Sequence, residues 1–168
     1  TPVRTLNAGA INFASAAITG TPASGTVFDV IQTDRSLASY WDGAADLATI
    51  RRSFLSCKAG DRRFGAMPVA YENATGVTVA FLLYDKAGSY IGEYQVASGG
   101  TNGAPTGGNP TLFTLVGGFT TAPANTAYAG LYARVTCSGA ANPKGYVGGR
   151  GQLCVVPAGQ TAWPPYVP

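Results

Sequence analysis

At 168 residues the chain has the length of one domain and can bury a sizeable core without a metal or a disulfide framework. Charged residues make up only 11% of it, the formal net charge is +3, and histidine is absent. The missing histidine excludes Ser-His-Asp and Cys-His catalysis and His-ligated metal sites, and the small net charge argues against nucleic acid as a partner.

Hydropathy and cysteine content further narrow the possible classes of protein. No run of about 18 apolar residues occurs, and the first thirty residues lack a basic start followed by an apolar run, so we expect neither a membrane span nor a signal peptide. Cys57, Cys137 and Cys154 form no C-x-x-C pair, which argues against a zinc site. We expect buried, unreactive thiols, with a Cys137–Cys154 bridge as the alternative, and no metal or cofactor.

Alternation of apolar and polar residues with period two recurs along the chain, whereas no window keeps a helical period between good caps. In chain order, strands are predicted at residues 27–33, 50–55, 67–72, 77–84, 90–96, 112–116, 128–137 and 151–156. A short helix at 44–52, capped by Asp42 or Gly43, is the one helical alternative. About eight strands at this spacing predict an all-β fold, a β-sandwich or jelly roll formed by one domain over residues 1–168.

Two strands show which faces should be buried. Both faces of 77–84 are largely apolar, which predicts a central strand. In 128–137 the inner set is Ala129, Leu131, Ala133, Val135 and Cys137, and the outward set is Tyr128, Tyr132, Arg134 and Thr136.

Glycine, proline and asparagine mark the connections. Turns are predicted at 42–43, 59–60, 73–76, 85–88, 117–118, 142–145 and 157–159. Residues 98–110 are rich in Gly, Asn, Thr and Pro, and we expect a mobile surface loop there. The proline-containing ends, 1–21 and 158–168, predict extended arms.

Carboxylate pairs are the remaining catalytic option, because two acids across a cleft can hydrolyse a glycosidic bond. The candidates are Asp42, Asp46 and Glu93. Asp42 precedes a glycine in a turn, Asp46 fits a loop or the first turn of a helix, and Glu93 alternates outward in a hairpin. We therefore expect no enzymatic activity.

One cluster of basic residues stands out, because Arg51, Arg52, Lys58, Arg62 and Arg63 are opposed only by Asp61. Four of them, Arg51, Arg52, Arg62 and Arg63, are candidates for a patch that binds an anionic partner through bidentate guanidinium contacts. The alternative is a solvated loop around Gly60, which the lack of interleaved aromatic residues favours.

Aromatic side chains are the strongest indication of function. Flat rings pack against the C–H faces of sugars, whose hydroxyl groups need polar partners nearby. Core packing is the alternative role for about half of the candidates. They are Tyr40, Trp41, Tyr90, Tyr94, Tyr128, Tyr132, Tyr146 and Trp163.

Three segments together resemble the galactose-binding-like carbohydrate-binding modules of tail fibres and other virion proteins of tailed bacteriophages. They are 81–92 (FLLYDKAGSYIG), 121–135 (TAPANTAYAGLYARV), and the end of the chain, with GQL at 151–153 and GQTAWPPYVP at 159–168. The resemblance implies a jelly-roll fold, sugar binding and a place in the virion. The acidic residues that hold a structural calcium on the family's last strand are missing from residues 148–154, so no calcium is expected.

Three functions follow as hypotheses. The leading one is a non-enzymatic phage virion surface protein that attaches to host glycan and contacts other virion subunits within a symmetric assembly. The rival is a capsid decoration or cement protein that stabilises the shell through subunit contacts. The third is a carboxylate glycosidase, which would lose sugar release when Asp42 or Asp46 is changed to Asn.

Overall fold

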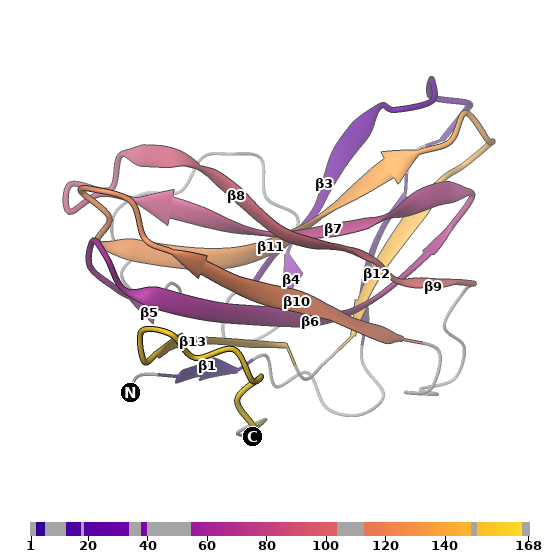
Figure 1. Ribbon diagram of the computed structural model, residues 1–168. Coiled ribbons are helices and arrows are strands. Elements are labelled where there is room, and N and C mark those ends of the chain that lie inside the picture. The colour runs from indigo at the N-terminus through magenta and orange to yellow at the C-terminus, as the bar shows by residue number, and fades with distance from the viewer. Residues whose placement is uncertain are drawn as a thin grey trace.

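The computed structural model describes residues 3–5, 13–17, 19–33, 38–39, 55–103, 113–148 and 151–165. In these residues the fold contains strands and no helix, and the strands form two sheets packed face to face (Figure 1). The predicted all-β sandwich is confirmed. The described residues form thirteen strands, more than the eight expected, because the fold contains five further strands of two to five residues.

The first sheet has seven strands and the second has six. The first contains β1 (Val3–Thr5), β2 (Phe13–Ala17), β6 (Arg62–Glu72), β9 (Thr101–Asn102), β10 (Thr114–Thr121), β12 (Lys144–Gly148) and β13 (Gln152–Val156). The second contains β3 (Val27–Thr33), β4 (Ala38–Ser39), β5 (Leu55–Ser56), β7 (Ala74–Tyr84), β8 (Tyr90–Gly99) and β11 (Tyr128–Cys137).

Strand β6 organises the first sheet, because each of its edges pairs with two shorter strands in succession. β13 pairs with Arg62–Ala66 and β12 with Val69–Glu72 on one edge, and β10 pairs antiparallel along Arg62–Val69 on the other. A single residue, Asn73, with a φ of 52°, connects β6 to β7 in the second sheet. β6 therefore contributes side chains to the core and to the outer face of the first sheet, and it connects directly to the second sheet.

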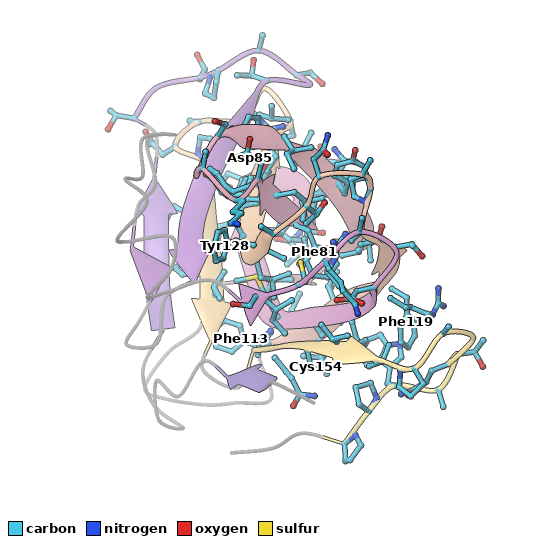
Figure 2. The ribbon with its side chains drawn as sticks, turned by 90° about the vertical axis from the view of Figure 1, so that its left-hand side faces the viewer. Phe81, Asp85, Phe113, Phe119, Tyr128 and Cys154 are labelled. Atoms are coloured by element: carbon cyan, nitrogen blue, oxygen red, sulfur yellow. The ribbon has the colours of Figure 1, made fainter. Side chains whose placement is uncertain are left out.

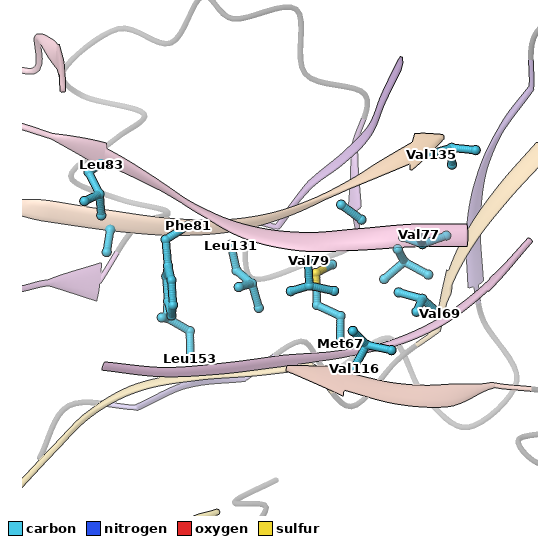
Figure 3. Packing of buried hydrophobic residues seen from close by; sticks show 13 residues of the cluster. Met67, Val69, Val77, Val79, Phe81, Leu83, Val116, Leu131, Val135 and Leu153 are labelled. Atoms are coloured by element: carbon cyan, nitrogen blue, oxygen red, sulfur yellow. The ribbon is translucent and has the colours of Figure 1, made fainter. Parts of the chain in front are cut away.

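The core lies between the sheets and follows the alternation of their central strands (Figure 3). Val77, Val79, Phe81 and Leu83 of β7 face it, while Ala80, Leu82 and Tyr84 form a second buried cluster on the other face. The prediction of a central strand with two apolar faces is confirmed, since β7 lies between β11 and β8. The inner set predicted on β11 is also buried.

Glycines on neighbouring strands let the layers approach closely. A Cβ on Gly65 would lie 2.8 Å from the Phe81 ring, and one on Gly117 would lie 2.2 Å from the Gly65 carbonyl oxygen. Gly117 and Gly118 are therefore inside β10, and the predicted turn at 117–118 is wrong. Gly117 satisfies a packing requirement of the β10–β6 pairing instead.

Several boundaries also differ from the prediction. The expected loop at 98–110 begins as strand, because β8 continues to Gly99 and β9 pairs in parallel with β6; residues 104–110 lie outside the described residues. Within the expected N-terminal arm, β1 pairs with β13 and β2 pairs with β12, so these two segments belong to the first sheet. The possible helix at 44–52 lies outside the described residues.

Candidate binding site on the outer face of the first sheet

The described part of the C-terminal segment packs against the outer face of the first sheet. Residues 157–160 form a turn closed by the Gln160 amide, which donates to the Pro157 carbonyl oxygen at 3.1 Å. The Gln152 side chain of β13 then donates to the Pro165 carbonyl oxygen at 3.2 Å. The expected C-terminal arm is therefore folded back at 158–165, and whether it contacts another subunit stays a prediction.

This packing creates an aromatic shelf, which we define as Phe64 of β6, Phe119 of β10 and Trp163. The ring centroids of Phe64 and Phe119 are 5.3 Å apart, and those of Phe64 and Trp163 are 5.2 Å apart, both with tilted planes. Figure 2 shows Phe119 next to the C-terminal segment. Phe64 is buried, whereas Trp163 keeps 46% of its surface exposed. The half-exposed Trp163 indole of the shelf therefore packs against the buried Phe64 ring.

Polar groups border the shelf on the side of Arg62. The Arg62 Nε donates to the Gln160 carbonyl oxygen at 2.8 Å, and its guanidinium carbon lies 4.7 Å from the Phe119 ring centroid. The Gln160 side-chain amide donates to the Ala162 carbonyl oxygen at 3.0 Å. Stacking and hydrogen bonding are therefore available side by side, which is the combination that sugar recognition needs.

Alternation explains why these side chains meet on one face. Phe64 and Arg62 are two residues apart on β6, and their partners in register are Phe119 and Thr121 on one side and Cys154 and Val156 on the other. Gly65 and Met67, the neighbours on β6, point to the core instead. Sequence reasoning named Arg62 and Trp163 but missed Phe64, Phe119 and Gln160. The Arg-x-Phe spacing within a strand was the available signal.

Tyr90 and Tyr94 lie at different depths on β8. The Tyr90 ring is 53% exposed and contacts the buried Tyr84 ring at a centroid distance of 5.6 Å. Tyr94 is half-buried and packs against the core. Burial raises the pKa of Tyr84 far above its usual range, and the neighbouring Tyr90 adds to that effect. Tyr90 is thus the second exposed ring, separate from the shelf.

Tyr132 and Tyr146 are not surface residues, so the expected exposure is wrong for both. Tyr132 faces away from the core as predicted, but it is 1% exposed within the cluster of Ala80, Leu82 and Tyr84. Tyr146 is 7% exposed and its hydroxyl donates to Glu72. Burial, together with this hydrogen bond, raises the pKa of Tyr146 to about 12. Neither ring can stack on a sugar in this conformation.

The predicted basic patch is divided by the alternation of β6. Arg63 points inward and is 0% exposed, with its guanidinium carbon 5.0 Å from the Phe81 ring centroid and Nη1 3.9 Å from the Cys57 sulfur. Burial lowers the pKa of Arg63 and raises that of the Cys57 thiol. Including Arg63 in a surface patch was therefore wrong, because its position in the strand places it between the sheets.

Tyr128 is half-buried and packs against the cluster that contains Tyr132. The remaining candidates fall into two groups. Glu93 accepts a hydrogen bond from Arg134 Nη1 at 2.9 Å in an ion pair on β8 and β11. Its expected outward orientation fits this pairing. The other candidates lie outside the described residues. They are Tyr40, Trp41, Asp42, Asp46, Arg51 and Arg52.

All three cysteines are free, so the alternative of a Cys137–Cys154 bridge is wrong. Cys154 lies opposite Phe64 in the first sheet, and Cys137 lies opposite Ala74 in the second. Within the described ranges, no group of three His, Cys, Asp or Glu side chains is placed to hold a metal ion. The same residues include no helix with the length and hydropathy needed to cross a membrane.

Comparison with known proteins found fold-level similarities only. No protein-family model matches the sequence, and no characterised protein sequence matches it. A chain in the structure of infectious bursal disease virus, Gt strain, is similar at a TM-score of 0.49 with 13% identity, over 90% of this chain and 30% of that one.

Two further solved structures are similar over most of this chain. The CBM22-1–GH10 modules of Clostridium thermocellum xylanase 10B, complexed with xylohexaose, give a TM-score of 0.43 with 10% identity, covering 90% of this chain and 26% of that one. The enzymatically active domain of bacteriophage CBA120 tailspike protein 4 gives a TM-score of 0.39 with 12% identity, covering 89% of this chain and 20% of that one. This chain therefore spans less than a third of the length of these three chains, and the functional argument rests on its own residues.

Proposed function

We propose that this chain is a non-enzymatic carbohydrate-binding β-sandwich on the surface of a bacteriophage virion, where it attaches to host glycan through the aromatic shelf. The observation that carries the proposal is the half-exposed Trp163 indole, held on Phe64 and bordered by Arg62 and Gln160. A sugar ring placed on the indole has hydrogen-bonding groups at its edge.

Preorganisation supports this use of the shelf. The Trp163 ring contacts Phe64, and the segment that carries it is fixed by the hydrogen bonds of Gln160 and Gln152. A ring that is already held in place loses little conformational entropy when a ligand arrives, so more of the stacking energy contributes to affinity. The low charge of the chain also reduces the cost of removing water from the surface around it.

The virion setting is supported by the sequence resemblance to modules of tailed-bacteriophage virion proteins. In this proposal the chain lies beside other virion subunits within a symmetric assembly. The non-enzymatic assignment is supported by the shelf itself, because β10, β13 and the C-terminal segment contain no acidic residue. Among the described residues, these three elements offer rings and donors but no carboxylate to act as a general acid.

Binding of purified bacterial polysaccharides to the wild-type chain and to Trp163→Ala tests the proposal. Loss of the stacking ring should weaken binding about tenfold or more, since aromatic stacking contributes on the order of 1 kcal/mol beyond buried area. Tyr90→Ala is the matched control, because it removes an equally exposed ring that lies outside the shelf. The control should bind as wild type does.

Two results would contradict the proposal. One is the absence of any polysaccharide-dependent signal, and the other is loss of binding in Tyr90→Ala with Trp163→Ala unaffected. A reconstruction of the intact virion checks the setting independently. A position at the tip of a fibre agrees with attachment, whereas regular lattice positions on the shell would favour the capsid decoration protein instead.

A further inference from the structure

Arg62 is a cation without an acidic partner at the edge of the shelf. In the described part of the chain no carboxylate lies within ion-pair distance of its guanidinium. The neighbouring Asp61 carboxylate accepts the Lys58 backbone N–H at 2.9 Å. The one acid on β6 itself is Glu72 at its far end, and no acid follows Glu93 in the sequence. Among the residues that the structure describes, Arg62 therefore has no carboxylate partner, and its charge is available to a ligand.

The geometry of the guanidinium determines which group it can accept. Its Nε is used by the Gln160 carbonyl oxygen, and one flat face covers the Phe119 ring. The end of the guanidinium that carries Nη1 and Nη2 remains. This pair of nitrogens matches two oxygens of a carboxylate or phosphate, which bind in a bidentate manner.

Arg62 and Trp163 belong to one continuous surface. Arg62 contacts Phe119, Phe119 contacts Phe64, and Phe64 contacts Trp163, each at about the distance of two packed rings. The chain also links them directly, because the carbonyl group that fixes Arg62 belongs to Gln160, three residues before Trp163. A single saccharide chain can therefore contact both groups.

We propose that the ligand of the shelf is an anionic saccharide, in which one sugar ring stacks on Trp163 and a carboxylate or phosphate group accepts hydrogen bonds from Arg62 Nη1 and Nη2. This inference rests on the proposed function and names the class of its ligand. A nucleic acid is disfavoured, since the single half-buried Arg62 that contacts the shelf rings among the described residues does not follow a phosphate backbone.

The test compares anionic with neutral polysaccharides, and then each bound anionic polymer with its own derivative that has lost the charge. The full chain is measured against polygalacturonate, hyaluronan, xanthan and phosphomannan, and against dextran and mannan as neutral members, together with purified capsular and O-antigen polysaccharides of both kinds. Each polymer bound in a Trp163-dependent manner is measured again after reduction of its carboxyl groups or enzymatic removal of its phosphate. The two treatments distinguish a carboxylate from a phosphate as the source of the anion.

Variants at Arg62 test the same contact from the protein side. Arg62→Gln should weaken binding at least about tenfold, and Arg62→Lys should recover only part of it, because a lysine keeps the charge but not the paired donors. Lys86→Gln is the matched control, since it removes one exposed positive charge in the turn between β7 and β8. Binding to the wild type should also fall between about 0.1 M and 1 M salt, as screening weakens an exposed ion pair.

The outcomes separate the two proposals. Bound polymers that carry an anion, and that lose binding about tenfold after its removal and in Arg62→Gln, support the inference. Trp163-dependent binding that survives both changes overturns the anionic class and leaves the proposed function intact. No binding to any member of the panel overturns both.

Discussion

Arg63 provides the sharpest test of how this fold tolerates a buried charge. The side chain is 0% exposed, and its Nε and Nη2 have no hydrogen-bond partner among the described residues. Its contacts are the Phe81 ring and, at 3.9 Å, the Cys57 sulfur. We consider Arg63→Met, which keeps an unbranched chain of similar length and removes the charge.

The unsatisfied donors of Arg63 and its cation–π contact contribute to the free energy of unfolding with opposite signs. Each buried donor without a partner costs about 1–3 kcal/mol, so the two nitrogens together cost about 2–6 kcal/mol. The desolvated cation–π contact with Phe81 returns about 2 kcal/mol. The penalty equals or exceeds the gain, and the cost of desolvating the charge is larger than its attraction by Cys57 and Asp61. We expect Arg63→Met to raise the free energy of unfolding by about 1–3 kcal/mol.

Urea denaturation of the wild type, Arg63→Met and Arg63→Ala measures this difference. Arg63→Ala removes the same charge but leaves a cavity, which costs about 2–5 kcal/mol, so it should be less stable than Arg63→Met by roughly that amount. The reasoning is refuted if Arg63→Met lowers the free energy of unfolding by more than about 1 kcal/mol while the far-ultraviolet spectrum is unchanged. In that case the guanidinium has a stabilising partner.

Three further expectations concern packing, pH and thiols. Gly117→Ala should destabilise the fold by about 1–3 kcal/mol or more in thermal melts, because its Cβ would lie 2.2 Å from a backbone oxygen. Gly118→Ala is the control and should change stability little, because its Cβ would lie 3.4 Å from the nearest atom. Because the pKa of Tyr146 is raised to about 12, its neutral hydroxyl contributes stability that is present below pH 10 and lost as the pH rises through 12. In thermal melts at increasing pH, Tyr146→Phe should therefore lose less stability than the wild type. A thiol reagent should label all three cysteines in denaturant. In the native state the buried Cys137 and Cys154 should react slowly. Fewer than three labelled thiols after denaturation would indicate a disulfide bridge.

Alternation was sufficient to predict the strands in the centre of the sandwich. β7 and β11 extend through the core, so their apolar residues recur at every second position and mark both the strand and its buried face. β1 and β2 escaped this reasoning because short strands of three and five residues contain too few positions for a period to show. Their place is set by pairing with β13 and β12, which lie at the other end of the sequence.

The candidate site was predicted in part for a related reason. Alternation tells which face of a strand a side chain occupies, but not whether that face is covered. Tyr132 is on the outer face of the second sheet as expected, yet it is buried there, whereas Trp163 is exposed because it follows the last strand and lies on top of the first sheet. The rings beneath Trp163 come from β6 and β10, which only the fold brings together.

The same alternation gives two adjacent arginines different roles. Arg62 points outward, where water solvates its charge and its free nitrogens can reach a ligand, and Arg63 points inward, where the charge is desolvated beside Phe81. Stability and ligand binding should therefore separate at neighbouring positions. Arg62→Gln should weaken saccharide binding and lower the free energy of unfolding by no more than about 1 kcal/mol, the value of one hydrogen bond. Arg63→Met should raise the free energy of unfolding and leave saccharide binding unchanged, because a strand residue that faces the core cannot contact a ligand on the opposite surface.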